Sequence, residues 1–356
     1  MLNDAPAADI ESDVVIIGDG VIGLSTALEL GRAGARGHIV GARHDGAASG
    51  AAAGLLAPSI GRLDPDVREL FEASLARYPG FVAGLSAFDP GLVLLEGLLQ
   101  VSSTAEPTRH ATRLDRAGMA LIEPALHAPS GGLLHPRDAA IDSVRLMSAL
   151  ALALDHQPGI TVTRDDPTAH VIFGSTGVRV KTRHGRTITG RTVVLAAGAW
   201  SSGIGGLPRA LSVAPLKGQM LALGATCLRH PVAGEDVYLV PRAEETVVGA
   251  TVEYAGFDTA VDDDAIERLR AAAVRLCPAL GAAPVVRRWA GIRPATPDML
   301  PILGRDPDMP ALIYACGHSK NGILLAPETA AIVTRLALNQ PPIRDLARFS
   351  VTRFAT

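Results

Sequence analysis

The chain has 356 residues, of which 48% are hydrophobic and 19% charged, and its formal net charge is -3. This length and composition indicate a globular protein with two domains, and they exclude a disordered chain. Because the charge balance is slightly acidic and only 4% of the residues are aromatic, the chain has no attraction for polyanions and few rings on which bases could stack. We therefore expect no nucleic-acid partner.

Cysteine usage argues against disulfide and zinc chemistry. The three cysteines, Cys227, Cys277 and Cys316, are odd in number, far apart and without a CxxC pair, so neither a disulfide framework nor a metal site is predicted. The sequence also contains no HExxH, GxSxG or P-loop lysine pattern, which leaves metal catalysis and acyl transfer without support. A reducing cytoplasm is the expected location.

The hydropathy pattern predicts no membrane segment. The most apolar stretch, residues 322–338, is interrupted by Pro327, Glu328 and Arg335, whereas a spanning helix needs about 20 consecutive apolar residues. Residues 1–10 carry neither a basic cluster nor an apolar core, so we expect a loose tail there rather than a signal peptide.

The first predicted elements form a βαβ unit. Residues 13–18 (DVVIIG) are a short apolar run ending on glycine, which is typical of a buried parallel strand. A helix is predicted over 23–33, because its leucines give it an apolar face and Gly34 provides a stop. Residues 36–41 (RGHIVG) indicate a second strand, and this order predicts a doubly wound α/β domain.

Later segments alternate between helix and strand. Residues 193–198 (VVLAAG) indicate a buried strand that returns to the first sheet, and residues 216–252 indicate antiparallel strands around a polar turn at 243–245. The remaining predicted elements are a helix over 141–154, an amphipathic helix over 262–276, a strand over 311–317 and a helix over 323–338. The chain therefore combines an α/β domain with a separate antiparallel region.

The strongest local motif is the GxGxxG sequence Gly18-Asp19-Gly20-Val21-Ile22-Gly23, which lies between a predicted strand and a predicted helix. Gly18 permits the tight turn, Gly20 lets the backbone approach a pyrophosphate, and Gly23 allows close helix packing. The unpaired N–H groups of the helix N-terminus favour phosphate there. A dinucleotide site is predicted, and the alternative is a glycine-rich turn without a nucleotide.

One expected element of that site is missing. A dinucleotide-binding fold usually has an acidic residue about 20 residues further on to hold the adenosine ribose, but the second strand ends with Gly41, Ala42 and Arg43. The nearest carboxylate is Asp45, so the ribose contact falls to Asp45 or to the backbone. Arg43 leaves open a 2′-phosphate and hence NADP, or simply a solvated surface charge.

A family resemblance emerges from the next residues. The segment ASGAAAGLLAP at 48–58 resembles the ASxAAAGxLAP stretch of glycine oxidases in the D-amino-acid oxidase family. The resemblance continues in chain order with VLAAGAWS at 194–201, PLKGQ at 215–219, YLVPR at 238–242, WAGIRP at 289–294, TPD at 296–298 and GHSKNGILLAP at 317–327. It therefore covers the chain from one end to the other.

The resemblance implies an α/β fold, with a Rossmann-like FAD-binding domain and an inserted, mainly antiparallel substrate domain. The implied FAD-binding ranges are 10–80, 141–212 and 289–350, and the implied substrate-binding ranges are 81–140 and 213–288. Cys316 does not match the cysteine to which sarcosine oxidases attach flavin, so noncovalent FAD is expected.

The resemblance also implies substrate-binding residues. Arg293 would hold the substrate carboxylate with its planar guanidinium, and the Tyr238 hydroxyl would donate to the same group. The alternatives are a structural ion pair for Arg293 and a packed strand aromatic for Tyr238. Lys320 stands where many relatives have arginine; it keeps the charge but loses the fork, or it is a surface charge.

The remaining implied residues surround the flavin. The helix that begins near Asn321 and Gly322 would direct its N-terminus at the pyrimidine edge and stabilise the charge that develops there on reduction. His318 is expected to be a loop or cap residue rather than a proton-transfer group. The implied FAD contacts are Gly18, Gly20, Val21, Ile22, Gly23, Arg43, Ser49, Ala52, Ala53, Gly54, Leu55, Ala197, Gly198, Trp200, Gly291, Arg293, His318, Lys320, Asn321, Gly322 and Ile323.

The implied activity is oxidation of glycine, sarcosine or a small D-amino acid. Hydride transfer from the α-carbon to the flavin gives an imino acid, then an oxo acid and ammonia, and dioxygen yields hydrogen peroxide. Three alternatives stay open: a dehydrogenase that uses a quinone or a carrier protein, a noncatalytic flavoprotein subunit, and an NADP-linked reductase. The enantiomer, the pathway and whether the chain forms a homo-oligomer are also open.

Overall fold

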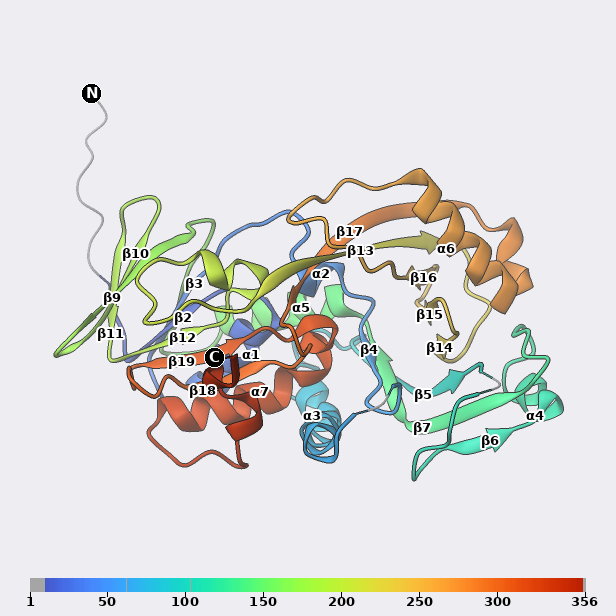
Figure 1. The fold of residues 1–356 in the computed structure, drawn as a ribbon, viewed down its shortest axis with the longest axis horizontal. Helices are drawn as coiled ribbons and strands as arrows, with labels where there is room; N and C mark the ends of the chain where they lie inside the picture. The colour runs from blue at the N-terminus through green and yellow to red at the C-terminus, as the bar shows by residue number, and fades with distance from the viewer. Residues whose placement is uncertain (1–9, 62, 103, 355–356) are drawn as a thin grey trace. The chain divides into compact units, whose positions relative to one another are not determined.

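The computed structural model describes residues 10–61, 63–102 and 104–354. The chain forms two compact units (Figure 1): a first unit of residues 1–49, 147–215 and 293–356, and a second unit of residues 50–146 and 216–292. The sequence-based ranges assign residues 50–80 to the FAD-binding domain, whereas these residues belong to the second compact unit. Of the expected loose tail over 1–10, residues 1–9 lie outside the described residues, and Ile10 begins a short strand.

The first unit is built on a six-stranded sheet with β2 near its centre. The order is β18-β19-β12-β2-β3-β8, and all neighbours are parallel except the pair β18 and β19. The strands are β2 (Val14–Ile17), β3 (Gly37–Val40), β8 (Ile160–Thr163), β12 (Thr192–Leu195), β18 (Ile302–Arg305) and β19 (Leu312–Cys316). The predicted return of the 193–198 strand to the first sheet is confirmed, because β12 pairs directly with β2.

A four-stranded sheet packs on one face of this larger sheet. Alternate residues of a strand point to opposite faces, and Val15 and Ile17 of β2 join a buried cluster with Val178 and Val180 of the smaller sheet. The smaller sheet has the order β1-β11-β10-β9, with β1 (Ile10–Glu11), β9 (Thr168–Gly174), β10 (Gly177–Thr182) and β11 (Thr187–Gly190). Strand β2 is therefore buried on both faces, which explains its unbroken apolar sequence.

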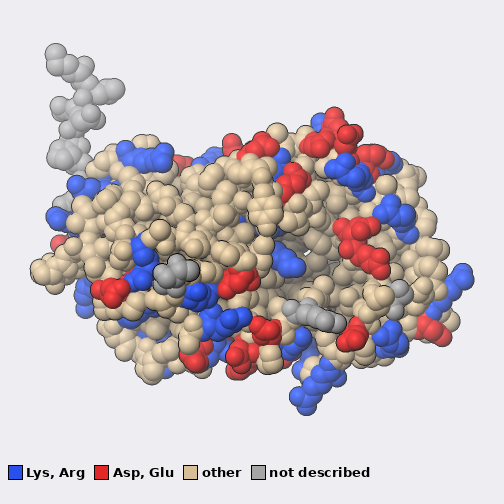
Figure 2. Space-filling model, viewed as in Figure 1, with Lys and Arg blue, Asp and Glu red and all other residues tan. Residues whose placement is uncertain are grey.

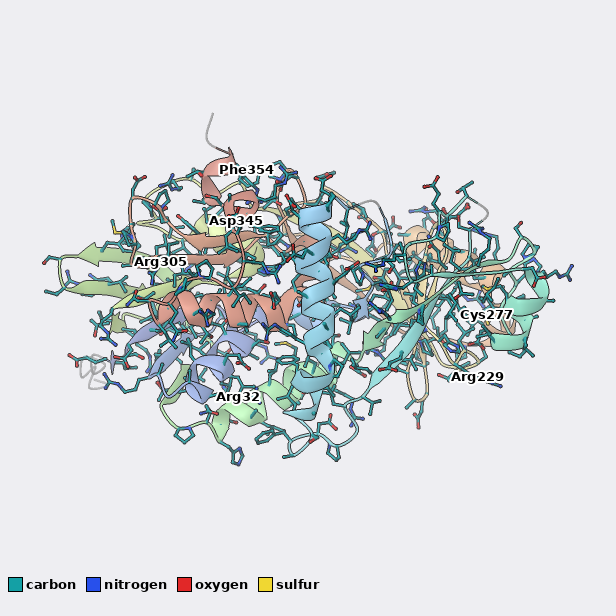
Figure 3. All side chains as sticks on the ribbon, turned by 90° about the horizontal axis from the view of Figure 1, so that it is seen from below. Arg32, Arg229, Cys277, Arg305, Asp345 and Phe354 are labelled. Atoms are coloured by element: carbon teal, nitrogen blue, oxygen red, sulfur yellow. The ribbon has the colours of Figure 1, made fainter. Side chains whose placement is uncertain are left out.

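Helices α1 (Val21–Arg32) and α7 (Gly322–Ala337) belong to the first unit and pack against each other. Arg305 of β18, labelled in Figure 3, donates hydrogen bonds to the carbonyl of Leu336 and to Asn339 Oδ1, the latter at 2.7 Å. These contacts satisfy carbonyl groups at the C-terminus of α7, where a positive charge is also favoured by the helix dipole. The far end of α7 is thereby anchored to the sheet.

The second unit contains a nine-stranded, mostly antiparallel sheet. Its order is β17-β13-β16-β15-β14-β5-β7-β4, with β6 paired to β7, and β14 and β5 form a parallel pair. The strands are β4 (Leu55–Leu56), β5 (Leu94–Gln100), β6 (Thr112–Leu114), β7 (Gly132–Ile141), β13 (Ala214–Leu223), β14 (Val232–Ala233), β15 (Tyr238–Pro241), β16 (Thr246–Gly249) and β17 (Val285–Ala295). The predicted antiparallel region over 216–252 is confirmed.

Amphipathic helix α6 (Asp263–Leu276) covers part of that sheet. Its N-cap, Asp262, accepts a hydrogen bond from the Asp264 N–H, and Ile266 and Leu269 are buried in a cluster with Leu221. Burial of each such side chain contributes about 1.5–3 kcal/mol. The other helices are α2 (Ala48–Ala51), α3 (Pro65–Ala83), α4 (Arg116–Ile122) and α5 (Ser143–Asp155), with short 3-10 helices at Gly198–Gly203 (η1), Pro278–Ala282 (η2), Ser319–Asn321 (η3), Ala347–Phe349 (η4) and Val351–Phe354 (η5).

The expected fold class is confirmed, and three element boundaries need correction. The first helix starts at Val21 rather than Gly23, because the glycine motif itself contributes the first turn. The helix predicted from 141 starts at Ser143, since Ile141 pairs with Leu94 in the sheet. The strand predicted to reach Gly198 ends at Leu195, and Gly198 begins a 3-10 helix.

Two surface observations bear on partners. On the face drawn in Figure 2, basic and acidic side chains are interspersed over the surface. Within the described residues, no helix combines the length and the apolar character that crossing a bilayer requires.

Candidate active site

The motif segments of the first unit meet at one edge of its sheet. Strands β3, β2, β12 and β19 are parallel neighbours, so their carboxyl ends lie side by side. The segments that leave these ends include Gly18–Gly23 after β2, Ala197–Trp200 after β12 and Gly317–Gly322 after β19. Open α/β sheets bind ligands at this edge, where connections on the two sides of a central strand run in opposite directions.

The glycine loop is held tightly against the sheet. Gly18 has a φ of +114°, and a Cβ there would overlap the carbonyl oxygen of Ala196. A Cβ at Gly23 would overlap the carbonyl oxygen of Gly18. Among the described residues, only Ser49 Oγ would lie within 4 Å of a Cβ at Gly20, at 3.1 Å. Gly18 and Gly23 are thus required by backbone packing, whereas a Cβ at Gly20 would need only a small shift of the Ser49 hydroxyl.

Ser49 supports the start of α1. The Val21 N–H donates to Ser49 Oγ at 3.0 Å, so this hydroxyl takes the place of a capping side chain, which the N-cap residue Gly20 lacks. Of the other predicted contacts in α1, Ile22 is buried. The first turn of α1 is therefore ordered by a residue from a separate segment.

The segment that follows β12 brings a ring to the same edge. Trp200 stacks on His44, with the two ring centroids 4.0 Å apart and an interplanar angle of 6°. Gly198 adopts a φ of +55°, which favours glycine at the start of this turn. Ala197 and Trp200 are half-buried, so the predicted contacts Ala197, Gly198 and Trp200 lie close to the segment after β3.

The segment that follows β19 contains a buried histidine. His318 Nε2 lies 3.2 Å from Thr329 Oγ1 of α7, and burial lowers the pKa of His318 to about 3. The imidazole is therefore neutral at physiological pH. Lys320 is exposed, Asn321 is the N-cap of α7 and Ile323 is buried in its first turn.

The ASGAAAG segment is fixed mainly by residues of the second unit. Trp289 Nε1 donates to the Ala51 carbonyl at 2.9 Å, and Ser143 Oγ donates to the Ala52 carbonyl. A Cβ at Gly54, whose φ is +89°, would overlap the carbonyl oxygen of Ile141. Ala53 is also buried. The small residues in this motif allow it to lie directly against the backbone of β7.

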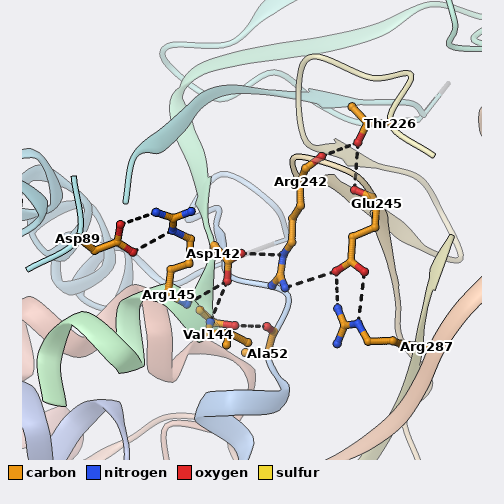
Figure 4. Close-up of polar contacts among 10 residues, drawn as sticks. Ala52, Asp89, Asp142, Val144, Arg145, Thr226, Arg242, Glu245 and Arg287 are labelled. Atoms are coloured by element: carbon orange, nitrogen blue, oxygen red, sulfur yellow. Dashed lines mark hydrogen bonds and ion pairs between the residues drawn. The ribbon is translucent and has the colours of Figure 1, made fainter. Parts of the chain in front are cut away.

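A chain of ion pairs continues from this segment (Figure 4). Asp142 Oδ2 lies 3.6 Å from Arg242 Nε, and Arg242 Nη1 lies 3.8 Å from Glu245 Oε1, which also pairs with Arg287. Arg145 forms hydrogen bonds to Asp89, one of them 2.9 Å long from Nε. Burial lowers the pKa of Arg242, while Asp142 and Glu245 act in the opposite direction. These contacts give Arg242 of the YLVPR motif a structural role that sequence reasoning missed.

The two predicted substrate residues lie in different units. Tyr238 of β15 is half-buried in the second unit, with its hydroxyl 3.4 Å from Met220 Sδ and its ring packed against a cluster that includes Val240. Arg293 of β17 is half-buried and belongs to the first unit, and its predicted neighbour Gly291 is buried in the second. Part of Tyr238 therefore serves packing, as the alternative for that residue held.

The TPD motif that follows Arg293 forms a closed polar network. Thr296 Oγ1 donates to the Leu300 carbonyl at 2.7 Å, and Arg353 donates to both oxygens of Asp298 at 2.9 and 3.1 Å. Burial raises the pKa of Asp298, but the Arg353 and Leu300 hydrogen bonds outweigh it and hold the pKa below its usual range. This network fixes the end of β17, and its partner Arg353 carried no motif that sequence reasoning could use.

The end of β3 differs from the expected pattern in a specific way. Arg43 and Asp45 are exposed. The carboxylate found at this strand end is instead that of Asp19, from the middle of the glycine loop, which fills the space beside Gly41. Sequence reasoning missed Asp19 because it considered only carboxylates that follow the second strand. The available signal was an acidic residue at a position of the loop otherwise bounded by glycines.

Comparison with known proteins gives this arrangement its family. The sequence profile of the DAO family, described as FAD dependent oxidoreductase, matches residues 13–336. The chain belongs to the DAO family of FAD-dependent oxidoreductases. The resemblance stated from the motifs is therefore confirmed, and so is the expectation of an FAD-dependent enzyme.

Individual members of the DAO family match over most of the chain. Glycine oxidase of Geobacillus kaustophilus is 32% identical over 96% of this chain and 97% of its own length. The crystal structure of glycine oxidase from Geobacillus kaustophilus superposes with a TM-score of 0.89, covering 98% of this chain and 100% of that one at 30% identity. A bifunctional protein ThiO/ThiG of Synechocystis is 34% identical over 97% of this chain, and the chain spans 54% of that relative's length.

The first unit fits the FAD of a DAO-family member. Gly18 and Gly23 pack against backbone, as the tight turn and the close helix packing of a dinucleotide loop require, and Gly20 is the position at which the backbone would approach a pyrophosphate. Val21 and Ile22 begin a helix whose N-terminus favours phosphate. When bound, FAD supplies the capacity to accept two electrons and a proton from a substrate.

Proposed function

We propose that this protein is an oxidase of glycine, sarcosine or a small D-amino acid. The observation that carries the proposal is the full-length match to glycine oxidase in both sequence and structure. In the proposed reaction the substrate loses a hydride from its α-carbon and a proton from its nitrogen, giving an imino acid. Water then converts the imino acid into an oxo acid and ammonia, or an amine where the nitrogen is methylated. Dioxygen takes up the two electrons and two protons as hydrogen peroxide.

Arg293 is the proposed anchor for the substrate carboxylate. A guanidinium donates two parallel hydrogen bonds to a carboxylate, and partial exclusion from water strengthens such a pair. Arg293 is half-buried near the end of β17, a strand whose following turn is fixed by the Asp298 and Arg353 pair. These features support an arginine of fixed position rather than a mobile surface side chain.

Tyr238 and Lys320 are proposed as secondary contributors. The Tyr238 hydroxyl would donate to the carboxylate without adding charge, and its ring is held by packing in the second unit. Lys320 is exposed in η3, where its ammonium would attract an anionic substrate without the directional fork of arginine. Orientation of the substrate, rather than acid catalysis by His318, would then provide the rate enhancement.

The FAD contacts predicted from the sequence are proposed as they stand, with the cofactor held noncovalently. The first unit would supply most of them, around the glycine loop and the start of α7. That helix start would face the part of the flavin that gains negative charge on reduction, where backbone N–H groups favour an anion. We propose the second unit as the substrate domain.

The experiment that tests the proposal is an anaerobic titration of the flavin followed by air. Glycine, sarcosine and a panel of D-amino acids would be added separately while the visible absorbance of the flavin is recorded. We expect at least one of them to bleach the flavin, and we expect readmitted air to restore the colour and release an equivalent of hydrogen peroxide.

Each other result has a defined meaning. Bleaching that air does not reverse would replace the oxidase by a dehydrogenase with a quinone or carrier acceptor. A flavin that none of these compounds bleaches would exclude the proposed substrates and favour a noncatalytic subunit. Reduction by NADPH alone would support the reductase alternative.

A further inference from the structure

The end of β3 has no side chain of its own where a dinucleotide fold usually places a carboxylate. The residue there is Gly41, and its φ lies outside the left-handed region that favours glycine. A Cβ at Gly41 would overlap Asp19 Oδ2 and lie 2.6 Å from Asp19 Cγ and 3.0 Å from its Cβ. Glycine at position 41 therefore leaves the space that the side chain of Asp19 fills.

The Asp19 carboxylate lies in that space and is half-buried. The backbone amides of Asp19 and Ala42 favour its charged form and so oppose the effect of burial on its pKa. An ionised carboxylate offers about four acceptor positions, which gives it capacity to accept hydrogen bonds from a ligand. Burial raises the pKa of Asp19. Hydrogen-bond donors on a ligand would offset this effect, because they favour the charged form of the carboxylate.

The neighbourhood of Asp19 is the ligand edge of the first unit. Asp19 follows Gly18 at the end of β2, and Ala42 follows β3, so the carboxylate lies between the ends of two adjacent parallel strands. His44 is close enough for the Asp19 charge to oppose the lowering of the His44 pKa by burial, and its ring is fixed on Trp200. A cis-diol placed at the end of β3 would meet a carboxylate of fixed position.

We propose that Asp19 binds the hydroxyl groups of the adenosine ribose of FAD, in place of an acidic residue at the end of β3. The glycine loop would then contribute two functions, since Gly20 gives access to the pyrophosphate and Asp19 reads the sugar beside it. Compared with the usual dinucleotide fold, the positions are reversed: the carboxylate lies in the glycine loop, as Asp19, and the strand end carries a glycine, Gly41. The inference concerns the cofactor alone and is independent of the proposed substrate.

The test measures binding of FAD to the full-length apoprotein by quenching of flavin fluorescence. Two ligands are compared, namely FAD and an analogue whose adenosine ribose is 2′,3′-dideoxy. Wild-type protein should bind FAD about tenfold to a hundredfold more tightly than the analogue, because hydrogen bonds to a charged group are lost. Asp19→Asn should weaken FAD binding by a similar factor and leave binding of the analogue nearly unchanged.

Two further variants locate the carboxylate. Asp19→Gly combined with Gly41→Glu returns the acidic group to the strand end, and it should recover discrimination between FAD and the analogue. Asp45→Asn alters the exposed carboxylate nearby and should leave both affinities within about twofold of wild type. If Asp19→Asn does not fold, the double variant provides the test. Tighter binding of FAD than of the analogue by the double variant would support the proposal, and equal affinity for the two would overturn it.

Three results would overturn the proposal. Equal affinity of the wild-type protein for FAD and the analogue would exclude any ribose contact. An equal loss of both affinities in Asp19→Asn would mean that Asp19 only stabilises the Ala42 turn. A loss of discrimination in Asp45→Asn but not in Asp19→Asn would assign the contact to Asp45. Since no substrate is used, failure here is distinct from failure of the proposed oxidase activity.

Discussion

The sheet edge of the first unit and the AAAG region of the second unit are built by different means. At the edge, backbone packs on backbone, as where Gly23 leaves no room between α1 and the Gly18 carbonyl. In the second unit, Gly54 also packs on the Ile141 carbonyl, but side chains from distant segments add hydrogen bonds to the motif, as where Trp289 donates to Ala51 and Ser143 to Ala52.

Local sequence reveals only some of these contacts. The glycines that close packing requires lie within one six-residue motif, so their spacing alone makes them recognisable in the sequence. A hydrogen bond such as that from Trp289 joins residues 238 positions apart, and neither partner signals the other. Three substitutions probe the comparison, beginning with the one of largest expected effect.

Arg293→Ala tests whether the side chain of Arg293 binds the substrate or only stabilises the fold. We expect kcat/KM for carboxylate substrates to fall about a hundredfold or more, because the loss of one partner of a desolvated charge pair costs about 2–5 kcal/mol. The kcat/KM of Arg293→Lys should lie between the values of Arg293→Ala and wild type, since lysine keeps the charge but lacks the forked guanidinium. Steady-state kinetics and FAD content provide the measurement.

The matched control for that experiment is Arg288→Ala on the same strand. Arg288 pairs with Asp263, and more than half of its side chain is exposed, so its loss should leave kcat/KM nearly unchanged. Unaltered kinetics in Arg293→Ala would remove this residue from the substrate site.

Gly23→Ala tests the backbone packing of the sheet edge. The added methyl group would overlap the Gly18 carbonyl, so we expect a loss of about 1–3 kcal/mol in the free energy of unfolding together with weaker FAD binding. Gly50→Ala is the control, because within the described residues no atom lies within 4 Å of its Cβ position. Chemical denaturation of both apoproteins measures the effect, and equal stability would contradict the packing role of Gly23.

Trp289→Phe tests the side-chain construction of the second unit. It removes the N–H donor to the Ala51 carbonyl and should cost about 1 kcal/mol of stability. The loss should be local, with faster amide exchange over residues 51–54 measured by hydrogen exchange. Tyr254→Phe, at a side chain that is 81% exposed, should change neither quantity. Unchanged amide exchange in Trp289→Phe would show that the Ser143 hydrogen bond and the Gly54 contact suffice to hold residues 51–54 in place.

The elements that sequence predicted well share strong local patterns. Strand β2, helix α1 and strand β3 were predicted from an apolar run and a glycine motif, and α6 from its spaced apolar residues and acidic start. The FAD-dependent family was also reached, because its motifs occur in order along the chain. Each of these features is encoded within about 15 residues.

The elements that sequence reasoning missed lack such patterns. Helix α3 contains Pro79, which interrupts the helical signal. Strands β9 and β11 each have a single buried residue, Val171 and Ile188, and so show no clear apolar pattern. Asp19 was overlooked because only carboxylates after the second strand were considered, and its contact with Gly41 forms only when β2 and β3 pair. The sequence did place an acidic residue between the glycines of the loop, but the pattern alone does not show what that residue contacts.

The order of strands in the first sheet has a consequence for synthesis of the protein. Strand β2 has Gly37–Val40 as one neighbour but must wait for Thr192–Leu195 as the other, and β19 and α7 follow only at Leu312–Ala337. A ribosome releases residues in sequence order at about 5–20 per second. The glycine loop therefore emerges well before β12, β19 and α7, the elements with which it forms the ligand edge. The apolar VVII strand meanwhile has one unpaired edge, which stays exposed until Thr192–Leu195 is synthesised. Cofactor capture at this edge is therefore an event of the finished chain.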